Sequence, residues 1–277
     1  MSSIAVITGA NGGIGVATTR ELAAAGWTVV ATARRPEASG ELRELAEQFP
    51  EVSVRALDVT SDESVDSCIG SVLADLGSID LLVNNAGAGH RGTLEQLTIE
   101  ELSQSMDLNF FGVARVTKAV LPAMRKARGG RVITVTSLNG IVALPFSDAY
   151  NAAKFAVEGL MESLAAVMRE FGVSISVLEP GPVRTAFFAN LSGHADAVDD
   201  DDPYAVLINR LNSRMAALGS GGQSPESVAG VIREIAADPS PALRYQSSEE
   251  SRAFAARKLV DATGRSVLDA TATLIQP

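Results

Sequence analysis

The stretch "IAVITGANGGIG" at residues 4–15 decides the fold. Its first half is a short apolar run, which is typical of a strand buried on both faces of a sheet. Its second half is a glycine-rich turn that leads directly into a helical pattern at 14–25. Gly9, Gly13 and Gly15 let the backbone approach a pyrophosphate, which binds at the N-terminus of such a helix. The stretch predicts a dinucleotide-binding unit, although its spacing is G-x-x-x-G-x-G rather than G-x-G-x-x-G.

Apolar β-branched runs alternate with longer amphipathic segments through residue 179. This order predicts an α/β protein with a doubly wound parallel sheet, the Rossmann fold, and ligands at the carboxyl ends of its strands. No segment resembles a linker, so we expect one domain over 1–277. The expected strands are 4–8, 28–33, 52–57, 79–84, 131–137 and 173–179, and the expected helices are 14–25, 37–48, 62–76, 99–127 and 148–171, with Gly26 and Gly172 at C-terminal caps.

The last third of the chain is less regular. Residues 182–223 contain scattered apolar residues and an acidic run, "DDDD" at 199–202, and we expect a flexible substrate loop over the strand ends. The acidic run itself is typical of solvated surface. After it we expect a helix from Pro225, a short strand at 242–245 and one or two helices in a C-terminal extension over 242–277.

The composition excludes several classes of protein. Apolar residues make up 46% and charged residues 20% of the chain, which is typical of a folded globular protein. The net charge of −10 argues against a nucleic-acid partner, which requires clustered Lys and Arg. Cys68 is the only cysteine, which excludes a disulfide framework and favours a reducing compartment. We expect a cytoplasmic protein with no membrane segment and no metal site.

The end of the second expected strand indicates which dinucleotide binds. An NAD site places a carboxylate there, about 20 residues after the glycines, to bind the ribose 2′-hydroxyl. This chain has Ala33 at that position, followed by Arg34 and Arg35. Guanidinium groups pair well with phosphate, so the sequence favours NADP(H) over NAD(H). Two solvated surface arginines are the alternative interpretation.

A second motif, "YNAAK" at 150–154, places a phenol and an ammonium one helical turn apart. Residues four apart share a helix face, so the charge of Lys154 is expected to favour the phenolate form of Tyr150. An unperturbed tyrosine has a pKa near 10 and needs such a shift to act as an acid or base at neutral pH. Alone, the spacing is also compatible with simple helix packing.

Seven motifs together resemble those of the short-chain dehydrogenase/reductase family, in the family's order over about residues 3–190. Two further stretches, 144–165 and 241–249, resemble the branch that contains the 17β-hydroxysteroid dehydrogenase type 1 and retinol dehydrogenase enzymes. The seven motifs are "TGANGGIG" at 8–15, "LDV" at 57–59, "NNAG" at 84–87, "LNFFG" at 108–112, "VTSLNG" at 135–140, "YNAAK" at 150–154 and "PGPVRT" at 180–185.

The resemblance implies a role for each matching residue. Tyr150 would be the general acid/base, and Lys154 would bind the nicotinamide ribose and lower the tyrosine pKa. Ser137 would hydrogen-bond the substrate carbonyl, and Asn109 would hold a water of the proton relay. The implied cofactor-binding residues are Gly9, Asn11, Gly13, Ile14, Gly15, Arg34, Asp58 and Val59 on the adenosine and pyrophosphate side, Asn85 and Gly87 near the adenosine ribose, and Pro180, Gly181, Val183 and Thr185 around the nicotinamide, together with Tyr150 and Lys154.

The expected function is therefore NADP(H)-dependent interconversion of a carbonyl and an alcohol. Epimerisation or dehydration with the same cofactor, and cofactor sensing without catalysis, are the alternatives. Apolar stretches at 138–146 and 185–191, the latter with Phe187 and Phe188, favour a hydrophobic small-molecule substrate. By resemblance, the helices at 99–127 and 148–171 would form a homodimer or homotetramer.

Two departures from the family's pattern bear on these expectations. Many NADP-using relatives have a hydroxyl or basic residue where this chain has Gly12, so the NADP assignment depends largely on Arg34. The steroid enzyme binds the far hydroxyl of its ligand with a late histidine, and this chain has no histidine from 195 to 277. His90 and His194 are expected to be loop residues.

Overall fold

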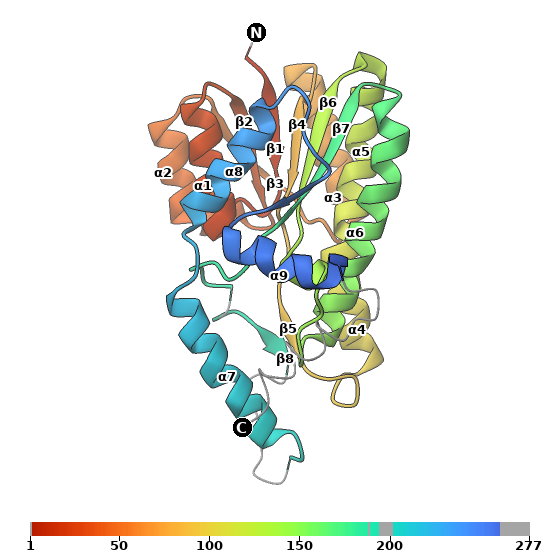
Figure 1. The fold of residues 1–277 in the computed structure, drawn as a ribbon. Helices are drawn as coiled ribbons and strands as arrows, with labels where there is room; N and C mark the ends of the chain where they lie inside the picture. The colour runs from red at the N-terminus through yellow and green to blue at the C-terminus, as the bar shows by residue number, and fades with distance from the viewer. Residues whose placement is uncertain (1, 188, 194–201, 261–277) are drawn as a thin grey trace.

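A computed structural model describes residues 2–187, 189–193 and 202–260, and a seven-stranded sheet forms its centre (Figure 1). All neighbouring strands in this sheet run parallel, so the predicted doubly wound sheet is confirmed. In order across the sheet the strands are β3 (Val52–Ala56), β2 (Thr28–Ala33), β1 (Ile4–Ile7), β4 (Leu81–Asn84), β6 (Gly130–Val135), β7 (Val173–Glu179) and β9 (Arg244–Gln246).

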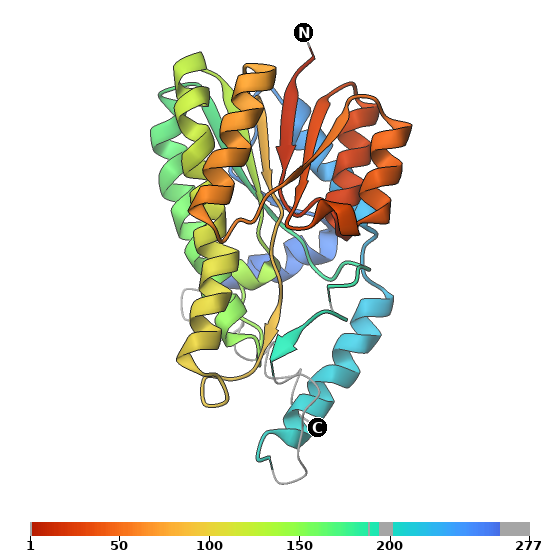
Figure 2. The same ribbon diagram turned by 180° about the vertical axis from the view of Figure 1, so that it is seen from behind.

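Helices cover both faces of the sheet, and Figure 2 shows the resulting three layers from behind. One face packs against α1 (Gly13–Ala24), α2 (Gly40–Gln48) and α8 (Pro225–Ala237). The other face packs against α3 (Asp62–Leu76), α5 (Gly112–Ala127) and α6 (Asp148–Arg169).

Alternating side chains explain why the strands are apolar at every position. In β1, Ile7 points into the core beneath α1, α2 and α8, whereas Val6 points into the core beneath α3, α5 and α6. In β2, Ala31 and Val30 divide in the same way. All four side chains are fully buried, and each large apolar side chain buried in this way contributes roughly 1.5–3 kcal/mol.

The order of the strands places a topological switch point between β1 and β4. The chain moves outward from β1 to β2 and β3, and then returns to place β4 on the other side of β1. In open parallel sheets, ligands bind outside the carboxyl ends of the strands at such a point. At the same end of the molecule lie β5 (His90–Arg91), β8 (Ser192–Gly193), α7 (Ala205–Ser220) and α9 (Glu249–Val260) (Figure 1).

Two segments differ from the sequence-based expectation. The helix expected over 99–127 is α4 (Ile99–Met106), a π-helical turn at Asp107–Phe111, and α5. The segment expected as a loop over 182–223 contains β8, which pairs with β5, and the helix α7. Helix α7 forms because Ile208 and Leu211 bury their side chains against Phe146.

The remaining expectations on the tail fall partly outside the described residues. Helix α8 begins at Pro225 as predicted, with Ser224 as its N-cap, and β9 begins two residues and ends one residue later than the strand predicted at 242–245. Of the acidic run, Asp202 is described, and its carboxylate accepts a hydrogen bond from Gln96 Nε2 at 3.1 Å. Residues 199–201 and 261–277 lie outside the described residues. No helix in the described part of the chain is long and apolar enough to span a membrane.

Candidate active site

The glycine-rich turn after β1 is tied by hydrogen bonds to the residues that follow β4. Thr8 Oγ1 accepts hydrogen bonds from the amides of Asn85 and Ala86, both at 3.0 Å. Asn85 Nδ2 in turn donates to the carbonyls of Thr8 and Gly9, also at 3.0 Å. Gly9 has a φ of +61°, and a Cβ there would lie 2.8 Å from the Cα of Ala86. Only glycine fits this close approach, and the carboxamide of Asn85 is engaged in holding the two strand ends together.

The N-terminus of α1 has the features of an anion site. Its N-cap residue is Gly12, which supplies no capping side chain, and its first turn contains no acidic residue. The helices α2, α3, α4 and α8 are instead capped by a Ser or Thr side chain. The first amides of α1 therefore have no side-chain acceptor, and they favour a negatively charged group such as a pyrophosphate. Asn11 is exposed beside them, and Ile14 is half-buried against the core.

The segment that follows β7 lies against this turn. A Cβ on Gly13 would lie 2.2 Å from Thr185 Cγ2, so the absence of a side chain brings the two segments together. At the other end of the segment, the carbonyl of Pro180 accepts a hydrogen bond from the amide of Leu138 at 3.0 Å. The segment 180–185 therefore extends from the residues that follow β6 to the glycine-rich turn.

Gln223 fixes the middle of this segment. Its backbone accepts a hydrogen bond from the amide of Arg184 at 2.8 Å and donates one to Pro182 O at 2.9 Å. Val183 is buried, and a Cβ on Gly181 would lie 2.7 Å from Ser251 Oγ of α9. The residues predicted to flank the nicotinamide are therefore held between the glycine-rich turn and the C-terminal part of the chain.

The ends of β2 and β3 carry opposite charges. Arg34 is exposed directly after β2, and Asp58 follows β3. Burial by itself would raise the pKa of Asp58, but hydrogen bonds from the Thr60 hydroxyl and amide, and the charges of Arg34 and Arg115, hold that pKa below its usual value. Asp58 is thus ionised at neutral pH. The next residue, Val59, is buried, and Ala33 at the end of β2 offers no carboxylate.

Ser137 and Tyr150 meet at the carboxyl end of β6. Ser137 lies two residues after the end of the strand, and Tyr150 lies in the first turn of α6. Burial raises the pKa of Tyr150 to about 12, and a hydrogen bond with Ser137 acts in the opposite direction. The lowering expected from the spacing of Tyr150 and Lys154 is therefore wrong for the protein by itself, because desolvation of the phenol outweighs the other contributions. Tyr150 is a protonated phenol at neutral pH.

Lys154 is buried and fixed by the end of the neighbouring strand. Its Nζ donates a hydrogen bond to Val135 O at 3.1 Å and lies 5.6 Å from the centroid of the Tyr150 ring. Burial lowers the pKa of Lys154 to about 8, while the charge of Glu158 raises it. A Cβ on Gly87 would lie 3.7 Å from this Nζ, so the segment that follows β4 faces the ammonium group.

Asn109 lies in the π-helical turn and is buried. Its Nδ2 donates to the carbonyls of Ala88 and Ser105 at 3.0 Å, and its Oδ1 accepts from the amide of Ala88 at 3.1 Å. The wider turn of a π-helix aims one side chain out of the regular helical pattern, and such turns are frequent at functional sites. Here the turn directs a carboxamide onto the backbone that follows β4. The water-holding role of Asn109 stays a prediction.

An aromatic side chain from the segment after residue 185 packs against the phenol. The ring of Phe187 lies 5.8 Å from that of Tyr150, and a Cβ on Gly89 would lie 2.9 Å from Phe187 Cζ. The pairing of β5 with β8 holds this arrangement, together with a 2.9 Å hydrogen bond between His90 Nδ1 and Ser192 Oγ. Phe188 and His194 lie outside the described residues.

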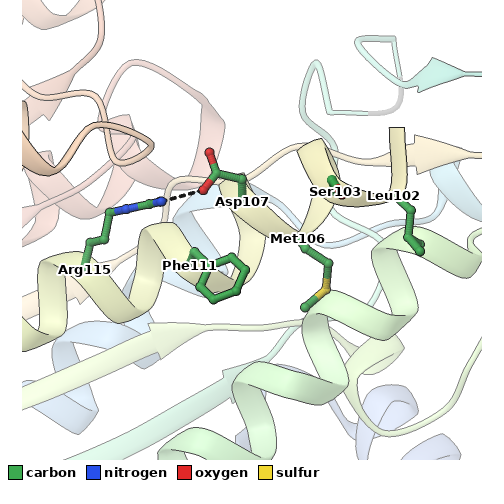
Figure 3. Close-up of a pocket in the computed structure, with 6 residues that line it drawn as sticks. All are labelled: Leu102, Ser103, Met106, Asp107, Phe111 and Arg115. Atoms are coloured by element: carbon green, nitrogen blue, oxygen red, sulfur yellow. Dashed lines mark ion pairs between the residues drawn. The ribbon is translucent and has the colours of Figure 1, made fainter. Parts of the chain in front are cut away.

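A groove of about 490 Å³ lies elsewhere, on the outer side of α4 and α5 (Figure 3). It contains none of the predicted site residues, and an ion pair of 2.7 Å joins Arg115 and Asp107 at its edge. Asn109 belongs to the same π-helical turn but is buried, so the groove is not part of the candidate active site. The described residues contain no group of three His, Cys, Asp or Glu side chains that could hold a metal ion. The groove is lined by Leu102, Ser103, Met106, Asp107, Phe111 and Arg115.

The structure also shows contributors that the sequence reasoning missed. Thr8 has no predicted role of its own, yet its hydroxyl joins the residues that follow two neighbouring strands. Glu158 lies one helical turn after Lys154 and is 5% exposed, and it contacts Arg244 of β9. A carboxylate on the buried face of a helix indicates that a partner must be present, because buried acids require one. The spacing of residues does not predict which residue that partner is.

Comparison with known proteins agrees with this geometry. Residues 3–196 match the family model described as short chain dehydrogenase. Retinol dehydrogenase 8 of Bos taurus is 36% identical over 269 residues, which cover 94% of this chain and 86% of that protein. The 17-beta-hydroxysteroid dehydrogenase type 1 of Homo sapiens is 33% identical over 276 residues, which cover 97% of this chain and 84% of that protein.

Solved structures share the whole fold. A short-chain dehydrogenase from Streptomyces avermitilis superimposes with a TM-score of 0.83 at 32% identity, covering 99% of this chain and 97% of that one. A metagenomic short-chain oxidoreductase in complex with NADP has a TM-score of 0.70 at 29% identity, covering 89% and 97% of the two chains. A short-chain dehydrogenase/reductase from Burkholderia phymatum in complex with NAD has a TM-score of 0.82 at 25% identity, covering 95% of each. Both dinucleotides therefore occur among similar folds.

Proposed function

The chain belongs to the short-chain dehydrogenase family, and from this membership we propose that it is an NADP(H)-dependent oxidoreductase that interconverts a carbonyl and an alcohol on a hydrophobic small molecule. One observation carries the proposal: Ser137, Tyr150 and Lys154 gather at the carboxyl edge of the sheet, which also carries the uncapped N-terminus of α1. The same edge of the sheet therefore carries both an anion site that suits a dinucleotide and a buried proton donor.

The protein's own groups supply the proton chemistry, and the nicotinamide of a bound cofactor supplies or accepts the hydride. In reduction, Tyr150 donates its proton to the carbonyl oxygen as negative charge develops there. The Ser137 hydroxyl donates a second hydrogen bond to the same oxygen. Lys154 carries a positive charge below a pH of about 8 and stabilises the phenolate that Tyr150 leaves behind. Each interaction strengthens as the reaction proceeds, which is what lowers a barrier.

The proposed cofactor contacts follow the edge of the sheet. The amides after Gly12 would hold the pyrophosphate, and the segment 180–185 would flank the nicotinamide. Asp58 would lie toward the adenine, and Arg34 would bind the 2′-phosphate of NADP(H). Support for the phosphate contact comes from the exposed guanidinium of Arg34 and from Ala33 in place of a carboxylate.

The proposed substrate is a hydrophobic ketone, aldehyde or alcohol. The ring of Phe187 packs beside Tyr150, and the apolar side chains of Ile141 and Val142 form a buried cluster with α9. Two of the relatives above are named for retinol and for hydroxysteroids, which are largely apolar molecules, and this supports the same substrate class here. The absence of histidine from 195 to 277 argues against recognition of a distant steroid hydroxyl by a late histidine.

We also propose a homodimer or homotetramer in the cytoplasm. The outer faces of α5 and α6 form an apolar groove that includes Leu121, Leu160 and Leu164, and Val167 beside it is exposed. Such faces are commonly covered by a second copy. Light scattering of the purified protein measures the assembly, and a monomer at micromolar concentration would contradict it.

A carbonyl screen with both cofactors tests the proposed function. The purified protein is mixed with NADPH or NADH and a panel of aromatic and aliphatic ketones and aldehydes, and oxidation of the cofactor is followed by absorbance. We expect NADPH-dependent turnover of hydrophobic members of the panel. Binding of cofactor with no turnover of any carbonyl or alcohol would instead favour a cofactor sensor. Turnover confined to charged, highly polar compounds would contradict the proposed substrate class.

A further inference from the structure

A buried cluster of charges links the C-terminal strand to Lys154. Arg244 of β9 directs its guanidinium toward three carboxylates, those of Glu158, Glu162 and Glu179. Its Nη1 contacts Glu158 and lies 3.1 Å from Glu179, and its Nη2 contacts Glu162. Glu158 is 5% exposed and Glu179 is fully buried, whereas the Glu162 side chain is 62% exposed. Two buried carboxylates therefore share one cation, and Glu179 also accepts a hydrogen bond from Gln246 Nε2 at 2.6 Å.

Glu158 is the member of this cluster nearest to the proposed reaction. It lies four residues after Lys154 on the same buried face of α6. Its Oε1 accepts a hydrogen bond of 2.6 Å from the hydroxyl of Thr136. Thr136 stands between Val135, whose carbonyl binds the Lys154 ammonium, and Ser137. Three consecutive residues at the end of β6 therefore contribute: Val135 binds Lys154, Thr136 binds Glu158, and Ser137 is the serine of the proposed site.

The balance of charge explains why the glutamate matters to the lysine. A buried ammonium is unstable without compensating groups, and burial already lowers the pKa of Lys154 to about 8. Burial, together with the charge of Glu158, raises the pKa of Glu179 to about 6, against the hydrogen bonds from Gln246 and Arg244. Four groups surround Lys154: the Tyr150 phenol and Glu158 on α6, the Val135 carbonyl on β6 and the Asn109 carboxamide in the π-helical turn. Three groups surround Glu158: Arg244 on β9, Glu179 on β7 and Thr136 on β6.

We propose that Glu158 is a positioning residue for the reaction: fixed by Arg244 and Thr136, its carboxylate keeps Lys154 charged beside Tyr150. The consequence for the fold is that β9, the last strand of the sheet, takes part in the chemistry through Arg244. This inference deepens the proposed function and rests on it for the role of Lys154. The electrostatic coupling of the two side chains is measurable without any substrate.

Lysine side-chain NMR measures the coupling directly. The chain contains only four lysines, Lys118, Lys126, Lys154 and Lys258, so the titration of each is resolvable after ¹³Cε labelling, with Lys154→Arg for assignment. The key variant is Glu158→Gln, which removes the charge but keeps the length of the side chain and an acceptor for the Thr136 hydroxyl. We expect the pKa of Lys154 to fall by roughly one unit, the low end of what a neighbouring opposite charge supplies.

Glu162→Gln is the matched control. It removes the same charge from the same arginine, on the same helix, but at the solvent-exposed side of the cluster. We expect it to leave the titration of Lys154 unchanged, because exposed charges are screened by water. The inference would be overturned if the pKa of Lys154 in Glu158→Gln equalled the wild-type value. It would also be overturned if the two variants shifted that pKa by the same amount.

Two further measurements test the coupling between Glu158 and Lys154. If Glu158→Gln does not fold, Lys154→Met provides the reciprocal test, since loss of the ammonium must change the electrostatic environment of the Glu158 carboxylate. An unchanged ¹³Cδ chemical shift of Glu158 in glutamate-labelled spectra would contradict the coupling. With a turned-over carbonyl in hand, the alkaline limb of the kcat profile of Glu158→Gln should move to lower pH by the shift seen for Lys154. Coupled titrations in a protein that reduces no carbonyl would retain the electrostatic link and refute the proposed function alone.

Discussion

Lys154 donates a hydrogen bond of 3.1 Å to the carbonyl of Val135, the last residue of β6. This contact fixes the ammonium group of a flexible side chain at the edge of the sheet. Ser137 follows two residues later on the same strand end, and Tyr150 precedes Lys154 by one helical turn. One strand end and the start of one helix therefore bring together Ser137, Tyr150 and Lys154.

Removal of the phenol hydroxyl should abolish turnover while leaving the cofactor site intact. For Tyr150→Phe we expect kcat to fall by roughly 10²–10⁴-fold, the usual contribution of a general acid. The buried ring is retained, so the melting temperature and the Kd for NADPH should stay close to those of the wild type. Tyr245→Phe is the control, because its hydroxyl bonds the Ala242 amide and its ring packs on the opposite face of the sheet. Equal losses in the two variants would contradict the role of Tyr150.

The rate of reduction should depend on the charge of Lys154. With a lysine pKa of about 8, we expect kcat for reduction to be constant at lower pH and to fall as the pH rises above about 8. The phenol, with a pKa of about 12, stays protonated over that range and does not limit the reduction. Oxidation of the alcohol requires the tyrosine to accept a proton, so the rate of oxidation should initially increase as the pH is raised. A reductive kcat that stays constant up to pH 10 would contradict this assignment.

Arg34 should decide between the two dinucleotides. For Arg34→Ala we expect the Kd for NADPH to increase roughly 10–100-fold, equivalent to the loss of a charge-assisted hydrogen bond of about 1.5–3 kcal/mol. The Kd for NADH should not change, since it has no 2′-phosphate. Arg35→Ala, an exposed arginine at the next position, is the matched control. Titrations followed by nicotinamide fluorescence give both constants. Tighter NADH binding in the wild type would refute the NADP(H) preference.

The glycine-rich turn should tolerate a methyl group at one position and not at the next. A Cβ on Gly13 would lie 2.2 Å from Thr185 Cγ2, so we expect Gly13→Ala to destabilise the protein by about 1–3 kcal/mol and to weaken cofactor binding. Gly12 has an extended backbone and nothing within 4 Å of the added atom. Gly12→Ala should therefore leave the melting temperature unchanged or slightly higher. Identical melting curves for the two variants would show that Thr185 moves freely away from the turn.

Much of this fold was predictable because its signals are local. Each strand of the sheet from β1 to β7 lies within two residues of its predicted limits, since apolar runs bounded by turns identify buried strands. Gly26 and Gly172 follow α1 and α6 with φ values of +85° and +72°, as expected of residues near a helix C-terminus. The arrangement of Ser137 and Tyr150 follows from these limits, because both lie at the carboxyl edge.

Other features depend on tertiary contacts that spacing does not encode. Helical periodicity continues through 107–111, so the π-helical turn that aims Asn109 at Ala88 has no signature in the pattern of residues. The pKa of Tyr150 was expected to fall because the Lys154 charge was readable and the degree of burial was not. The contact of Arg244 with Glu158 joins residues 86 positions apart, and only the folded sheet brings them together.

Transfer of the hydride itself is the most direct property to measure. The protein is incubated with NADPH carrying deuterium at both C4 positions of the nicotinamide and with a hydrophobic ketone from the screen, and the product is analysed by mass spectrometry. For the wild type we expect an alcohol with deuterium on the former carbonyl carbon, and for Tyr150→Phe, with cofactor bound, almost none. A product formed without deuterium, by epimerisation or dehydration, or equal deuterium transfer by the Tyr150→Phe variant, would contradict a carbonyl reductase that uses Tyr150 as its proton donor.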